Sequence, residues 1–149
     1  AKGTFEMSKA TTLTGQVKAA LEAISTANGY SVNLSGVLLF GERKVDSIAA
    51  PYLLVNIGTD ELVDFKGKAA LRHVVYMVEG VMGRSSSLQD LQALHRDIIK
   101  ALGLGELPAS RPLANGWPFE ESAEFMPDQD GSTNRTLTSS ITLAYIENY

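Results

Sequence analysis

The sequence predicts an α+β fold: a mixed, largely antiparallel β-sheet with two main helices packed on it and a C-terminal β-hairpin. Two segments have apolar residues at helical spacing. The strand-like segments lie between and after these helices and do not alternate with them. The chain has 149 residues, 44% of them hydrophobic and 20% charged. We therefore expect one domain with one core over residues 1–149, with residues 1–11 flexible.

The first helix is predicted over residues 13–27. Thr12 or Thr14 can cap its start, and Gly29 can adopt the left-handed conformation that ends a helix. The apolar residues expected on its buried face are Val17, Ala20, Leu21 and Ile24.

Two short extended segments follow this helix. Residues 30–34 are predicted to be a strand or an extended edge. The apolar run 37–40 fits either a strand or the foot of a mobile loop that continues to residue 46. Pro51 then favours the start of a new strand.

The centre of the chain is rich in β-forming residues. Residues 52–57 are apolar on both faces except at Asn56, so they are predicted to be a central strand with both faces covered by helices. Residues 58–61 are predicted to be a turn. A short strand is expected at 62–65, followed by a second turn. The long strand 70–81 has apolar residues on both sides, so we expect it to be buried.

The second helix, over residues 88–102, has the clearest local pattern in the chain. Ser86 or Ser87 can form a capping box, and Asp90 lies in the first turn, where the helix dipole favours a negative charge. Lys100 lies in the last turn, and Gly103 ends the helix. The apolar face should hold this helix to the sheet.

The last third of the chain predicts a long connection and a hairpin. The connection spans 104–118 and contains Trp117, the only tryptophan. Residues 119–126 are predicted to be a strand, 127–131 a tight turn and 135–145 the last strand. Apolar and hydroxyl residues alternate in the last strand, so we expect one of its faces to be wet.

Composition disfavours several classes of function. The net charge is −4, whereas nucleic-acid binding needs a positive field. The chain has no cysteine, so thiolate chemistry, disulfides and Cys-ligated metals are excluded. The first residues lack the apolar region of a secretory signal, and no apolar run approaches the ~18 residues of a membrane span. We therefore expect no membrane association.

The motif search indicates no catalytic residue, no cofactor and no metal, and so no enzyme. His73 and His95 would bind a metal only if they met across the sheet–helix interface, and no further ligand cluster frames them. Ser85, Ser86 and Ser87 fit helix capping better than nucleophilic catalysis. The segment 128–131 lacks the terminal glutamate of a calcium loop.

The C-terminal hairpin is acidic. Glu120, Glu121, Glu124 and Asp128 are either a solvated face or an electrostatic contact surface in an assembly. The segment 37–46 is similarly either an ordinary edge hairpin or an arm that presents apolar residues to a neighbour.

The whole pattern resembles the tail terminator (tail completion) proteins of long-tailed bacteriophages, of the minor tail protein U type. The resemblance covers residues 13–145. It comprises a first helix, the strand that follows Pro51, the long strand, the capped helix, the Trp-bearing connection and a final strand that closes on Tyr145. Related neck and head–tail joining proteins share this architecture.

The resemblance implies a virion protein of the tail and neck, assembled in the host cytoplasm as a hexameric ring. Such a ring caps the tail tube, ends tail elongation and presents a surface to the head–tail connector, while genomic DNA passes through an acidic lumen without specific binding. Candidate tube or connector contacts are the four acidic residues of the hairpin. Candidate subunit contacts are Leu38, Leu39, Phe40, Arg43, Phe65 and Trp117.

Two other interpretations stay open. The chain could be another neck component, such as a head-completion or adaptor protein. It could also be a small bacterial α+β ligand-binding or enzyme domain that uses the histidines or the glutamates, which a deep pocket at those residues would favour.

Overall fold

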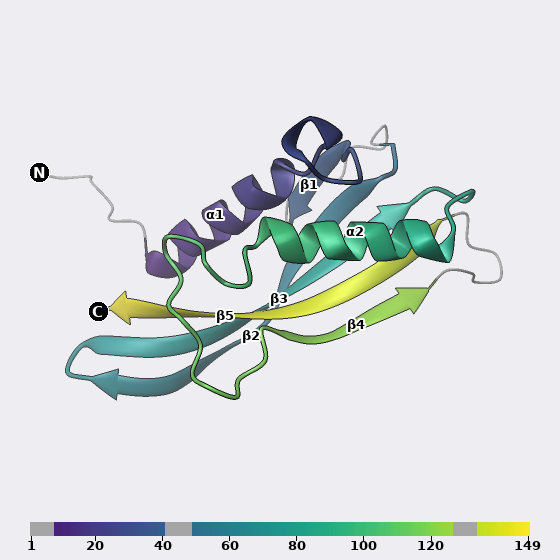
Figure 1. Ribbon diagram of the computed structural model, residues 1–149. Coiled ribbons are helices and arrows are strands. Elements are labelled where there is room, and N and C mark those ends of the chain that lie inside the picture. Colours follow the sequence, from purple (N-terminus) through teal and green to yellow (C-terminus); the bar gives the residue numbers. More distant parts are fainter. Residues whose placement is uncertain (1–7, 41–48, 127–133) are drawn as a thin grey trace, which may run out of the picture.

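The computed structural model describes residues 8–40, 49–126 and 134–149. Two α-helices and one 3₁₀ turn accompany five strands in this part of the chain (Figure 1). In chain order the elements are α1 Lys9–Glu22, η1 Thr26–Asn28, β1 Gly36–Leu39, β2 Tyr52–Lys66, β3 Ala69–Met82, α2 Leu88–Ala101, β4 Glu120–Met126 and β5 Arg135–Asn148.

The five strands form one mixed sheet in the order β1-β2-β3-β5-β4. β1 runs parallel to β2, and the other neighbouring pairs are antiparallel. The C-terminal strands β4 and β5 pair as a hairpin, although the predicted turn at 127–131 lies outside the described residues. The predicted fold class is therefore confirmed.

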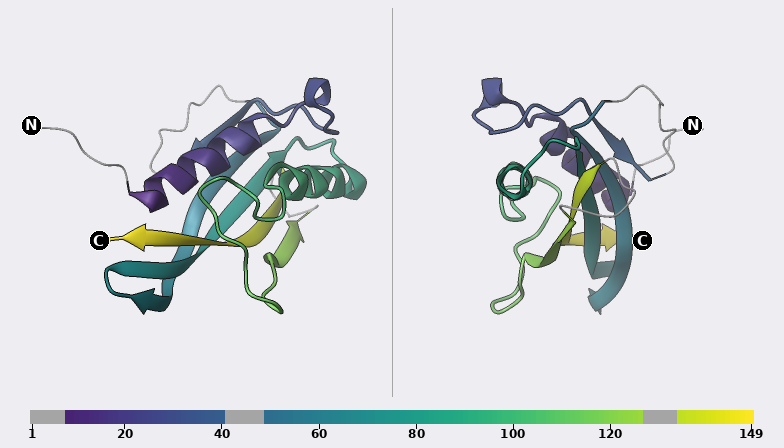
Figure 2. Two further views of the ribbon diagram at one scale, coloured as in Figure 1. Left: turned by 60° about the vertical axis from the view of Figure 1, so that its left-hand side comes forward. Right: turned by 90° about the vertical axis from the view of Figure 1, so that its right-hand side faces the viewer.

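Both helices pack on the same face of the sheet (Figure 2). The strand register identifies this face, because Val55, Val78 and Ser139 lie in one row across β2, β3 and β5, and Val55 and Val78 belong to the core. The neighbouring row, through Leu54 and Glu79, points to the opposite face. No helix of the described residues covers that face, so the expectation that helices cover both faces of residues 52–57 was wrong, because Tyr52 and Leu54 lie on the side without helices.

The predicted turn at 58–61 is also wrong, because β2 continues through it as one strand to Lys66. The pairing register between β2 and β3 shifts at two places, between Ile57 and Thr59 and between Leu62 and Asp64. The separate strand expected at 62–65 is therefore the second half of β2. The following turn is confirmed at Gly67, which has a positive φ of 60°.

The first helix begins earlier than predicted. The Ser8 side chain accepts a hydrogen bond from the Thr11 N–H and caps α1, so residues 9–11 are helical, whereas we expected them to be flexible. α1 ends at Glu22, and Gly29 ends the 3₁₀ turn that follows. Residues 1–7 lie outside the described part of the chain.

Residues 30–34 form no strand, because a buried carboxylate holds part of their backbone. Asp97 on α2 accepts hydrogen bonds from Ser31 N–H and Val32 N–H at 2.9–3.2 Å. These donors are therefore unavailable to a sheet ladder. β1 starts after this segment, at Gly36.

The second helix agrees with its prediction to within one residue. Ser87 is the N-cap, and Asp90 completes the capping box by accepting from the Ser87 N–H. α2 lies close to β3 at Gly80, where an added Cβ would be 2.6 Å from a methyl group of the buried Leu94.

The last strand is more buried than its alternating pattern predicts. Ser140, Thr142 and Ala144 lie on the face without helices, yet all three are buried. Two backbone hydrogen bonds tie the preceding connection to β5: Arg111 N–H donates to Ala144 O, and Thr142 N–H donates to Phe119 O. The connection therefore lies along the outer edge of β5 and excludes water there.

Candidate interaction surfaces

The outer half of the β2–β3 hairpin is an arm that extends past the helices (Figure 1). We call residues 57–66 of β2, with the strand paired to them, the hairpin arm. Among the described residues, β1 pairs only with Tyr52–Val55, so no strand lies along the outer edge of the arm. The arm exposes Leu62, Val63 and Phe65, and Phe65 is 69% exposed. Phe65, a predicted subunit contact, is therefore accessible to another molecule.

A second apolar surface lies at the start of the arm. Phe40, which follows β1, is 85% exposed, and Ile57 beside it is about half exposed. These two side chains stand at a cavity of about 330 Å³ that also contacts Leu39, Val55 and Tyr76. The Tyr76 hydroxyl is 2.8 Å from the Thr14 hydroxyl of α1, which satisfies a polar group that would otherwise be unpaired. We call this cavity the apolar pocket.

The other candidate subunit contacts are less available than Phe40 and Phe65. Leu38 is partly buried within β1, and Leu39 packs against the core. Trp117 is about half exposed because its ring packs edge-on against His73, with 4.5 Å between ring centroids. Arg43 lies outside the described residues.

Glu120 is a structural residue more than an accessible contact residue. A hydrogen bond of 2.6 Å joins Glu120 Oε2 to His95 Nε2 on α2, and the buried Ser139 hydroxyl donates to the same oxygen. The serine contacts the carboxylate and not the imidazole, so this cluster lacks the contact by which a histidine activates a nucleophile. It attaches β4 to α2 instead.

The other glutamates of β4 face the side of the sheet without helices. Glu124, Thr138, Glu79 and Leu54 form one row across the four strands. Glu121 accepts a hydrogen bond of 3.2 Å from Thr142, two rows further along the same face. Asp128 lies outside the described residues.

Further along this face, Glu61 pairs with His73 across β2 and β3. The surface therefore carries several carboxylates, whereas Ser140 and Thr142 on the same face are buried. We call it the open face, defined by the rows that contain Glu61, Glu79, Glu121 and Glu124.

A polar cluster on the helix side of the arm was missed by the sequence analysis. Arg72 Nε donates to Asp60 Oδ1 at 2.7 Å, and the Tyr145 hydroxyl donates to Asp60 Oδ2. Burial, together with this hydrogen bond, raises the pKa of Tyr145. Next to the cluster, Glu147 accepts from the N–H groups of Lys9 and Ala10 at the start of α1. An open hollow of about 880 Å³ borders these residues, and the Arg72–Asp60 ion pair lies in its wall.

The two histidines lie on opposite sides of the sheet and do not meet. His73 is on the open face and His95 on α2, so the metal site that would need both is not formed. Within the described ranges, no group of three or more His, Asp or Glu residues has the arrangement of a metal site. His73 is 7% exposed, and its Nδ1 has no hydrogen-bond partner among the described residues. Burial lowers the pKa of His73, and the charge of Glu61 partly opposes this.

No protein-family model matches the chain, and no curated protein matches it. None of the helices in residues 8–40, 49–126 and 134–149 is long and apolar enough to cross a membrane.

Proposed function

We propose that this chain is a structural virion protein of a long-tailed phage, a tail terminator that forms a hexameric ring on the tail tube. In this role it stops tail elongation and provides the interface for head–tail joining. Its partners are other copies of itself, the tail tube protein and a head–tail connector or adaptor protein.

The main support for this proposal is that the open face carries several carboxylates and is not covered by the helices. Both helices cover one side of the sheet, and the opposite side carries Glu61, Glu79, Glu121 and Glu124. In a ring with this side inward, the carboxylates would repel DNA phosphates, so the genome would pass without binding. A ring whose inner surface is basic would contradict the proposal.

The apolar side chains outside the core also favour an assembly. Phe40 and the end of the arm are separated along the sheet and are therefore two different patches. Head-to-tail contacts in a ring need two different patches on each subunit. The enzyme alternative needs a pocket at the histidines or glutamates. The hollow beside His95 and Glu120 is wide and open, and the Glu120 carboxylate is already bonded to His95 and Ser139.

The test is the mass of the protein in solution, measured by light scattering over a range of concentrations. A hexamer, stable or concentration-driven, is the expected result, and purified tail tubes should then bind it at their ends. Failure of the protein to bind or cap tail tubes would refute the proposed function.

A further inference from the structure

The apolar pocket can hold one large apolar side chain. Its cavity of about 330 Å³ lies between α1, the end of β1 and β2, with Tyr76 and Val55 at its base. Ile57 and the exposed Phe40 stand at its mouth. The polar residues that line it are Thr14 and Tyr76, whose hydroxyls are paired with each other, and Asn56. A concave, mainly apolar site with a few polar groups is typical of a binding pocket.

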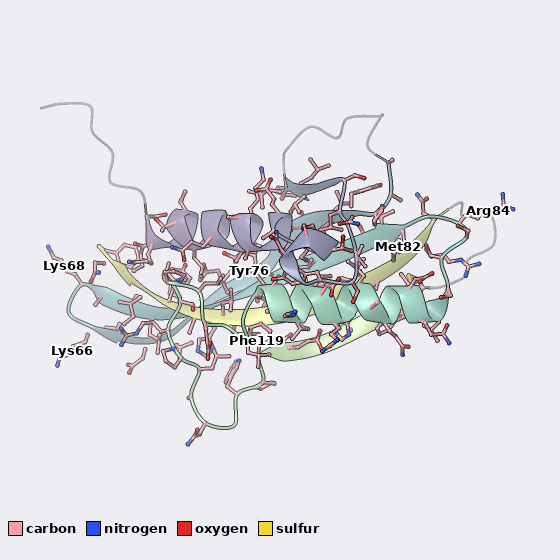
Figure 3. The ribbon with its side chains drawn as sticks, turned by 45° about the horizontal axis from the view of Figure 1, so that its top comes forward. Lys66, Lys68, Tyr76, Met82, Arg84 and Phe119 are labelled. Carbon is pink, nitrogen blue, oxygen red and sulfur yellow. The ribbon has the colours of Figure 1, made fainter. Side chains whose placement is uncertain are left out.

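The other end of the arm has side chains of matching chemistry. Ile57, Leu62 and Phe65 all lie on the helix side of β2, because they pair with Tyr76, Arg72 and Ala70 of β3. Leu62 and Phe65 are exposed there. In Figure 3, Lys66 and Lys68 mark the end of the arm, opposite the end that bears Met82 and Arg84.

The same chain cannot place its own Phe65 in its own pocket. Phe65 follows Ile57 by eight residues in a continuous strand, which is about 25 Å. The strand is paired with β3 along this length, so it cannot fold back. Phe65 can therefore reach only the pocket of another molecule.

The charge pattern disfavours a symmetric pairing of two arms. An antiparallel pairing that brings Ile57 opposite Phe65 of a second copy also brings Glu61 opposite Glu61 of that copy. Like charges directly opposite each other destabilise paired strands. A contact between two different patches avoids this repulsion, and such contacts generate rings.

We propose that the end of the arm of one copy docks into the apolar pocket of the next copy, with Phe65 seated between Phe40 and Ile57. This inference rests on the proposed ring and names its subunit contact. The exposed apolar side chains of arm and pocket have on the order of 500 Å² of surface, roughly half of what a biological interface buries. The charged residues that flank Phe65 would supply part of the polar rim.

Disulfide crosslinking tests this contact directly, because the natural chain has no cysteine. A chain with both Phe65→Cys and Ile57→Cys should form, under mild oxidation, a ladder of covalent multimers up to the ring. A mixture of the two single variants should form crosslinked dimers that contain one of each. The matched control pairs Phe65→Cys with Leu104→Cys, which is similarly exposed but outside the pocket, and should give no ladder.

A second variant makes the result independent of oxidation. Phe65→Ser should keep the circular dichroism spectrum of the folded chain and raise the concentration needed for assembly roughly tenfold or more. A wild-type hexamer that gives no crosslink and is unaffected by Phe65→Ser would overturn the contact and leave the ring intact. A wild-type monomer at every concentration, without crosslinks, would also overturn the contact, and tube binding would then decide the proposed function separately.

Discussion

Replacing Asp97 with alanine should destabilise the fold by about 3 kcal/mol. Asp97 is 2% exposed, and its carboxylate accepts hydrogen bonds from Ser31 N–H and Val32 N–H. Hydrogen bonds to a charged group contribute about 1.5–3 kcal/mol each. We take the lower value because Ser31 is exposed and its N–H can bond to water in the variant. For a chain of this length, the loss corresponds to roughly 6–12 °C in Tm.

Urea unfolding followed by circular dichroism measures this loss. Asp97→Asn is the matched control: it keeps one acceptor oxygen and the side-chain shape, so it should lose roughly half as much. Asp90→Ala at the start of α2 removes an exposed cap contact and should cost about 1 kcal/mol. If Asp97→Ala lowered the free energy of unfolding no more than Asp90→Ala does, the Asp97 carboxylate would not be the group that holds residues 30–34 to α2.

Two other perturbations concern β3. The lowered pKa of His73 means that the unfolded chain binds a proton more readily than the folded chain. Stability should therefore fall as the pH drops below the ordinary value of 6.5, and His73→Gln should flatten this dependence in urea titrations at about pH 7.5 and about pH 5.5. Gly80→Ala should lower the free energy of unfolding by about 1–3 kcal/mol in the same urea assay, because its new methyl group would meet Leu94. An unchanged urea midpoint would contradict this and would mean that α2 can move away from β3 without loss of stability.

The sequence predicts an element well where its signals are local and agree with one another. The capping box at Ser87 and Asp90, followed by a helical apolar face, placed α2 to within one residue. The segment 58–61 contains turn-favouring residues, yet the ladder with β3 keeps it extended. Pairing along a neighbouring strand outweighs these local preferences, and local sequence does not reveal it.

Contacts between distant segments explain the other differences. Nothing near residues 30–34 indicates that Asp97, more than 60 positions away, bonds their N–H groups. Glu120 likewise appears in sequence as one of several acidic residues, and only the packing of β4 against α2 pairs it with His95. Phe40 and Phe65 are apolar residues outside the predicted core pattern, and both are exposed.

The two proposed surfaces lie on opposite sides of the sheet, so they can be tested separately. Ile57 and Phe65 are on the helix side of β2, whereas Glu79 and Glu124 lie in one row on the open face. Replacing both Glu79 and Glu124 with lysine should leave the mass of the assembly unchanged, because neither residue contacts the arm or the pocket.

The same change should make the ring retain DNA, because lysines in the lumen would attract the phosphates that the carboxylates repel. The retention should weaken steeply as salt increases, whereas the mass should not change. DNA retention is measured by co-sedimentation with the wild-type ring as the control. Loss of the ring in this variant would show instead that the open face contacts another subunit, and the lumen would have to be assigned to a different surface.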